Sequence, residues 1–127
     1  MTITAVTLLV IYDLAMSSRK FYLRFANLVN AVNKDAGMDL DNIAMKLLEA
    51  ITEAHAAGTP LKVTDALDLD LASAATLHKK IDHLKAQGLV QIEHPEDTKR
   101  TKFLAPTEQA LDHLDALGKA LLKAAKK

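Results

Sequence analysis

The positions of apolar side chains between residues 73 and 87 predict a helix. Leu77, Ile81 and Leu84 stand at i, i+4 and i+7, so they lie along one face of a helix. Gly88 follows directly, and glycine most easily adopts the left-handed conformation that ends a helix. The polar side chains are expected on the opposite face, with hydroxyl groups near the start and cations further along: Ser73, Thr76, Lys79, Lys80 and His83, with His78 at the edge.

The residues around this helix predict a small β-wing. The runs 89–92 and 101–105 favour strands, and the charged, turn-forming cluster 93–100 lies between them. Residues 61–63 are expected to supply a third short strand, and Thr64 to cap the short helix that follows. A short helix, a turn, a longer helix and a hairpin in this order predict a winged helix-turn-helix, mainly α with a small β-wing.

A second apolar stripe predicts a helix over residues 17–33, with Ser17 or Ser18 as its cap. The segment 1–15 before it leaves two alternatives open. Its β-branched residues favour a strand, yet it has no obvious pairing partner, and it could instead extend the helix. The stripe itself consists of Phe21, Phe25, Leu28 and Val32.

Two more helices are expected, one before and one after the winged motif. Asp39 or Asp41 is expected to cap the first, which stops before Gly58. The last begins at Thr107 and ends in lysines, which suit the negative end of a helix. Its apolar stripe consists of Leu111, Leu114, Leu117, Leu121 and Leu122.

The apolar stripes of the terminal helices exceed what one small winged domain can cover. Such stripes usually mark a partner, and a homodimer through these helices is the economical solution. The alternative is that the two helices pack on each other within one chain. The predicted organisation is therefore an N-terminal segment and dimerisation helix over 1–36, a winged helix-turn-helix domain over 37–106 and a C-terminal dimerisation helix over 107–127.

Length and charge set further limits on these expectations. A chain of 127 residues fits one domain with an ordinary core. Its 16 basic and 16 acidic residues give zero formal net charge, which counts against very strong binding to nucleic acid. The segment 73–102 carries a modest basic excess that its histidines raise if protonated. Any affinity from phosphate contacts should be moderate and sensitive to salt.

Cysteine and membrane signals are both missing from the sequence. The chain has no cysteine, which removes disulfides and thiolate metal sites and fits a cytoplasmic protein. The apolar run from Ile3 to Met16 is interrupted by Asp13, has no preceding basic residue and is too short to span a bilayer. We expect a cytoplasmic protein with no membrane partner.

The segment from Ser73 to Leu89 resembles the MarR-type winged-helix regulators, in particular members whose recognition helix reads Ser-x-Ala-Thr-Leu-His followed by two basic residues. The resemblance covers roughly Asp41 to the C-terminus. It implies sequence-specific binding of double-stranded DNA by a homodimer, repressor-like regulation of transcription and a small-molecule effector. The chain departs from that pattern in the wing, where Asp97 and Arg100 stand three apart rather than two.

A recognition helix enters the major groove by its N-terminal end, and a wing reaches the backbone or the minor groove. Base edges are expected to meet Thr76, His78 and Lys79, with His83 on the same polar face, and Ser73 to meet a phosphate. Arg100 is the expected cation at the wing tip. Phosphate contacts are expected from Lys80, Lys85, Lys99 and Lys102.

Metal binding and catalysis find no support in the sequence. The five histidines show no i, i+3 or i+4 pair, and no nucleophile–base arrangement or phosphate loop can be picked out. We therefore expect no metal, no cofactor and no enzymatic activity. The alternative to DNA binding is a winged-helix module for protein–protein interaction, because Asp65, Asp68 and Asp70 precede the recognition helix and would repel phosphate.

Overall fold

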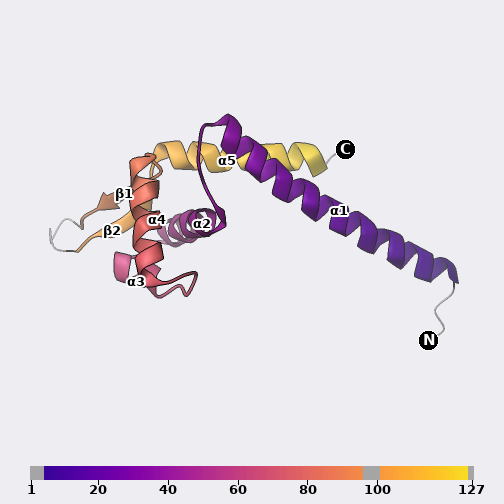
Figure 1. The fold of residues 1–127 in the computed structure, drawn as a ribbon, viewed down its shortest axis with the longest axis horizontal. Coiled ribbons are helices and arrows are strands. Elements are labelled where there is room, and N and C mark those ends of the chain that lie inside the picture. The colour runs from indigo at the N-terminus through magenta and orange to yellow at the C-terminus, as the bar shows by residue number, and fades with distance from the viewer. Residues whose placement is uncertain (1–4, 96–100, 126–127) are drawn as a thin grey trace. The chain divides into compact units, whose positions relative to one another are not determined.

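The computed structural model describes residues 5–95 and 101–125, with side chains from residue 18 onward (Figure 1). The chain divides into two compact units, Met1–Gly37 with Leu117–Lys127, and Met38–Ala116. The elements are α1 (Ala5–Asp35), α2 (Asn42–Ala56), α3 (Val63–Leu67), α4 (Ala74–Ala86), β1 (Val90–Glu93), β2 (Phe103–Pro106) and α5 (Glu108–Ala125). The expected class, mainly α with a small β-wing, is confirmed.

The core of the second unit is built around α2. Ala44, Leu47, Leu48 and Ile51 are fully buried on one face of this helix. Burying a leucine or isoleucine side chain stabilises a fold by about 1.5–3 kcal/mol, so this face holds the unit together. The partners packed against it come from every other element of the unit: Ala66, Ile81, Leu84, Leu89, Val90, Leu104 and Ala110.

The wing is a two-stranded antiparallel sheet, with Val90 opposite Pro106 and Ile92 opposite Leu104. The expected third strand is reduced to one bridge between Lys62 and Phe103. It is short because α3 begins at Val63, where the Asp65 carboxylate accepts a hydrogen bond of 3.0 Å from the backbone N–H of Lys62. The prediction that Thr64 caps this helix is wrong, since the capping carboxylate comes from within the first turn.

α2 begins at one of the two predicted caps. The carboxylate of Asp41 accepts a 2.8 Å hydrogen bond from the backbone N–H of Ala44, which satisfies a donor that has no partner inside the helix. Residues 38–41, the linker between α1 and α2, are thereby tied to the start of α2.

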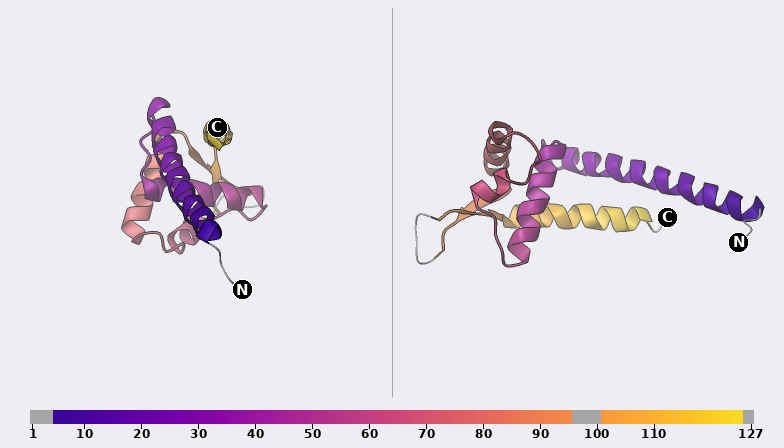
Figure 2. Two further views of the ribbon diagram at one scale, coloured as in Figure 1. Left: turned by 90° about the vertical axis from the view of Figure 1, so that its right-hand side faces the viewer. Right: turned by 90° about the horizontal axis from the view of Figure 1, so that it is seen from below.

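α1 is one uninterrupted helix from Ala5 to Asp35 (Figures 1 and 2). The prediction of a cap at Ser17 or Ser18 is wrong, because both residues lie inside the helix. Of the two alternatives for the preceding segment, the helix is correct for residues 5–16. A formed helix gains one hydrogen bond for each residue added, and no glycine or proline interrupts this run.

Part of the predicted stripe of α1 remains accessible. Phe25, Leu28 and Val32 are half-buried. Phe21 is 45% exposed, and its neighbours Tyr22 and Leu23 are 65% and 54% exposed. No helix in the described part of the chain is long and apolar enough to cross a membrane.

Candidate nucleic-acid interface

α4 has defined ends. The hydroxyl oxygen of Ser73 accepts a 3.2 Å hydrogen bond from the backbone N–H of Thr76, and the same hydroxyl donates to Thr76 Oγ1 at 3.0 Å. Gly88 follows the helix with φ +74°, a conformation that favours glycine. These residues confirm the predicted start and stop of the helix.

The side chains of α4 fall into three groups around its axis. Leu77, Ile81 and Leu84 are buried, as the apolar spacing predicts. A second group, the linker-side stripe, is half-buried and consists of Thr76, Lys80, His83 and Gln87. The third group is exposed and comprises Ala74, Ala75, His78, Lys79, Asp82, Lys85 and Ala86.

Three members of the linker-side stripe contact the linker. Lys80 Nζ forms an ion pair with the carboxylate of Asp41. The backbone carbonyl oxygen of Asp39 lies 2.8 Å from His83 Nε2 and accepts a 3.0 Å hydrogen bond from Gln87 Nε2. The prediction that Lys80 and His83 share the open face of the helix is therefore wrong. At 100° per residue these positions fall beside the apolar stripe, where the linker covers them.

The ion pair changes the electrostatics of the linker. The hydrogen bond from Lys80, followed by the one from the backbone of Ala44, holds the pKa of Asp41 below its ordinary value. Asp41 thus remains a carboxylate beside the recognition helix. Sequence reasoning identified Asp41 as a cap but missed its contact with α4. The spacing of residues 76, 80, 83 and 87 marks that second stripe.

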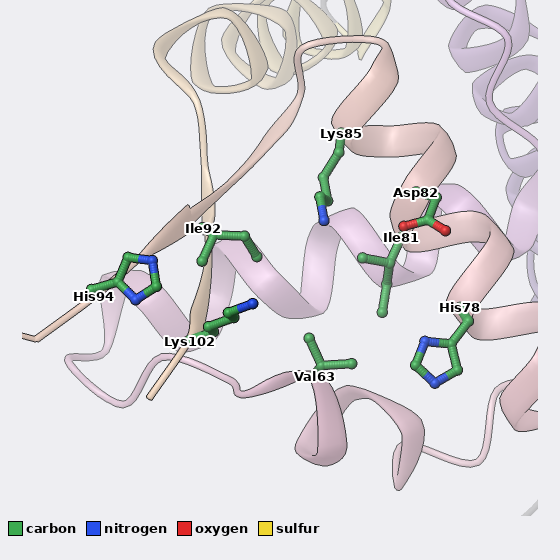
Figure 3. Close-up of a pocket in the computed structure, with 8 residues that line it drawn as sticks. All are labelled: Val63, His78, Ile81, Asp82, Lys85, Ile92, His94 and Lys102. Carbon is green, nitrogen blue, oxygen red and sulfur yellow. The ribbon is translucent and has the colours of Figure 1, made fainter. Parts of the chain in front are cut away.

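The opposite side of α4 faces the wing across a pocket of about 420 Å³ (Figure 3). Lys85 from the helix and Lys102 from the wing extend toward the same space (Figure 3). The pocket therefore combines an apolar floor with a mainly basic rim. Its lining consists of Val63, His78, Ile81, Asp82, Lys85, Ile92, His94 and Lys102.

The candidate residues are thus only partly brought together. His78, Lys85 and Lys102 meet at the wing-side pocket, and Lys79 is exposed on α4. Lys99 and Arg100 lie outside the described residues, as does Asp97. His94 was missed as a candidate, although its place directly after the first strand makes it part of the lining of the same pocket.

The acidic residues before α4 lie at the surface. Asp65, Asp68 and Asp70 are all exposed, and Asp70 has φ +60° in the turn that leads to the recognition helix. Aspartate tolerates this left-handed conformation better than most residues with a side chain. In the described part of the chain, no group of three histidine or acidic residues is placed to hold a metal ion.

No protein-family model matches the chain, and no curated protein matches its sequence. Solved structures do share its fold. A mutant of MepR from Staphylococcus aureus, bound to an oligodeoxyribonucleotide, superposes with a TM-score of 0.67 at 14% identity, covering 91% of this chain and 78% of that chain. Tm0816 from Thermotoga maritima, described as a MarR-like transcriptional regulator, gives 0.62 at 17% identity, covering 90% and 79%.

NadR in complex with 4-hydroxyphenylacetate gives a TM-score of 0.59 at 16% identity, covering 91% of this chain and 74% of that chain. At these identities the likeness is one of fold. The chain has the winged helix-turn-helix fold of the MarR-type transcriptional regulators.

Proposed function

We propose that the protein is a sequence-specific regulator of transcription that binds double-stranded DNA as a homodimer. The observation that carries this proposal is the capped helix α4, whose exposed side chains include His78, Lys79 and Lys85, beside a β-wing. The fold is that of a MepR mutant solved with an oligodeoxyribonucleotide. The neighbouring structures are transcription regulators, which supports a role other than catalysis.

The N-terminal half of α4 would enter the major groove, because a helix of this diameter fits that groove. Thr76, His78 and Lys79 would approach base edges, while Ser73 and the N-terminal backbone would meet a phosphate. His83 would remain beside the linker unless binding rearranges it. Cations at the rim of the pocket and in the wing would contact the backbone or the minor groove: Lys85, Lys99, Arg100 and Lys102. Lys80, on the linker-side stripe, would contact a phosphate from the other side of the helix.

The terminal helices would form the dimer arm. Phe21, Tyr22 and Leu23 of α1 and Leu122 of α5 are 45% or more exposed in one chain, which leaves apolar surface for a second copy. In this proposal residues 1–36 and 107–127 hold two reading domains, residues 37–106, about one turn of DNA apart, which is roughly 34–36 Å. The target would then be a palindrome.

We propose that the protein represses transcription by occupying an operator, and that it does so in the cytoplasm. A small-molecule effector belongs to the same proposal, supported by NadR, whose structure was solved with 4-hydroxyphenylacetate. Such an effector would act by favouring or disfavouring the arrangement that fits the operator.

The first test is titration of purified protein into labelled mixed-sequence duplex DNA, followed by fluorescence anisotropy at about 50 and about 200 mM salt. Binding that weakens by orders of magnitude over this range supports phosphate contacts from several cations. The operator can then be selected from a random pool. A protein that binds no duplex at the lower salt concentration contradicts the proposal.

A second candidate function rests on the acidic residues before α4. Asp65, Asp68 and Asp70 are exposed and would repel a DNA backbone, so the winged domain could instead bind another protein. The two functions differ in the effect of neutralising these carboxylates. Substitution of all three by asparagine should strengthen binding to DNA, whereas it should weaken binding to a basic protein partner.

A further inference from the structure

Asp41 is not part of the recognition helix, but its carboxylate neutralises a cation on that helix. Its carboxylate caps α2 through Ala44 and pairs with Lys80 on the linker-side stripe of α4. The side chains of Asp41 and Lys80 are 49% and 27% exposed, so the pair lies at an accessible edge. A DNA phosphate approaching this edge would meet an ammonium group that already has an anionic partner.

Lys79, the next residue along α4, provides a contrast. It is exposed, and in the described part of the chain no carboxylate lies within ion-pair distance of it. Lys79 and Lys80 carry the same charge but differ in what a phosphate must displace to reach them. The sequence alone counts both as equal cations.

We infer that Asp41 limits the DNA affinity of this protein by competing with a backbone phosphate for Lys80. The inference rests on the proposed DNA-binding function. Two anions cannot both approach one ammonium group closely without repelling each other, so DNA either displaces Asp41 or leaves Lys80 unused. Either way the recognition helix binds DNA more weakly than its number of lysines implies.

Asp41→Asn tests this inference with little change to the fold. Asparagine caps helices about as well as aspartate, so the hydrogen bond from Ala44 can persist while the charge is removed. The anchoring of His83 and Gln87 does not use the Asp41 side chain, because both contact the backbone oxygen of Asp39. Thermal unfolding of the variant verifies that it remains folded.

The expected gain in affinity follows from the strength of an exposed ion pair. Pairs of this kind correspond to about a twofold to fivefold change in an equilibrium constant. We expect Asp41→Asn to bind duplex DNA about twofold to fivefold more tightly. The slope of log affinity against log salt should become steeper by about one, as for one additional phosphate contact.

Asp39→Asn is the matched control, since it removes a carboxylate of the same linker that forms no ion pair with Lys80 in the described part of the chain. It should give a smaller gain and leave the salt slope nearly unchanged. The decisive comparison places Asp41→Asn in a Lys80→Met background, where the gain should largely disappear. An equal gain with and without Lys80 would mean simple repulsion by Asp41 and would overturn the inference.

Two further outcomes separate this inference from the proposed function. If the wild-type protein binds DNA and Asp41→Asn binds equally or more weakly, the inference fails while the proposed function stands. If neither protein binds any duplex at about 50 mM salt, where phosphate contacts are strong, the proposed function fails and the inference fails with it.

Discussion

Thr107 joins the end of the recognition helix to the start of α5 through Gly88. Its hydroxyl donates a 2.6 Å hydrogen bond to the carbonyl oxygen of Gly88 and accepts one of 3.1 Å from the backbone N–H of Ala110. The backbone N–H of Thr107 donates to the carbonyl oxygen of Leu89 at 3.0 Å. One residue thus fixes the exit of α4 and the entry of α5 together.

Thr107→Val should lower the free energy of unfolding by about 1–3 kcal/mol. Valine has a similar volume, but it lacks the hydroxyl that caps α5 and donates a hydrogen bond to the carbonyl oxygen of Gly88. Urea unfolding measures the loss. Thr64→Val, at an exposed position of α3, is the control and should change stability by less than about 0.5 kcal/mol. Equal losses in the two variants would contradict a joining role for Thr107.

Gly88→Ala should destabilise the protein by about 1–2 kcal/mol, since φ is +74° there and alanine disfavours that conformation. The added Cβ would also lie 3.1 Å from Oε1 of Gln109, a side-chain end that can move. Gly118→Ala, inside α5 with no atom within 4 Å of the new Cβ, should instead stabilise by about 0.5–1 kcal/mol. Chemical denaturation measures the free energy of unfolding of both variants, which should change in opposite directions.

His113 should make stability depend on pH. His113 is only 6% exposed, and this burial lowers the pKa of its imidazole. The unfolded chain therefore takes up the proton first, so stability is fully present above a pH of about 6.5 and declines as the pH falls toward the folded pKa. Urea unfolding at several pH values should show this decline in the wild type and a flatter profile in His113→Leu.

Lys79→Ala should weaken binding to duplex DNA and make the salt slope shallower by about one if this lysine contacts a phosphate. A base-edge contact would instead relax sequence preference with little change in slope. Lys46→Ala is the control, because Lys46 is exposed on α2 rather than on α4.

Arg100→Ala should also weaken binding, as expected for a cation at the wing tip. Anisotropy titrations of the four proteins, wild type included, make the comparison.

Leu122→Glu should convert the proposed homodimer to monomers. Leu122 is 64% exposed in one chain, and a charge in an apolar interface costs free energy unless it is paired. Sedimentation equilibrium measures the mass. Lys119→Glu changes charge at an exposed position of the same helix and should leave more dimer intact. A wild-type protein that is monomeric at micromolar concentrations would contradict the proposed arm.

The sequence was most informative where local chemistry and burial agree. Ser73, the stripe of Leu77, Ile81 and Leu84, and Gly88 predict the recognition helix correctly because spacing and end residues point to the same element. The start of α1 was less predictable, since β-branched residues fit a helix or a strand and Ser17 can stand inside a helix as well as cap one.

The contact between Lys80 and Asp41 could not be predicted from the sequence, for a different reason. The two residues are 39 apart in the chain, and their meeting depends on how the linker crosses α4. Long-range pairs of this kind are set by the packing of α2 against α4 rather than by any local pattern. The sequence identifies the charges but not which of them neutralise each other.

The three groups of side chains on α4 have a consequence for divergence. Leu77, Ile81 and Leu84 maintain the core, and the linker-side stripe maintains the position of the helix, whereas Ala75, Lys79, Asp82 and Ala86 have exposed side chains. Substitutions at such exposed positions usually change stability by less than about 0.5 kcal/mol. Under the proposed function, a lineage descended from this protein could therefore alter its target preference by mutation at exposed positions in the first half of the helix, such as Ala75 and Lys79, while inheriting the same scaffold.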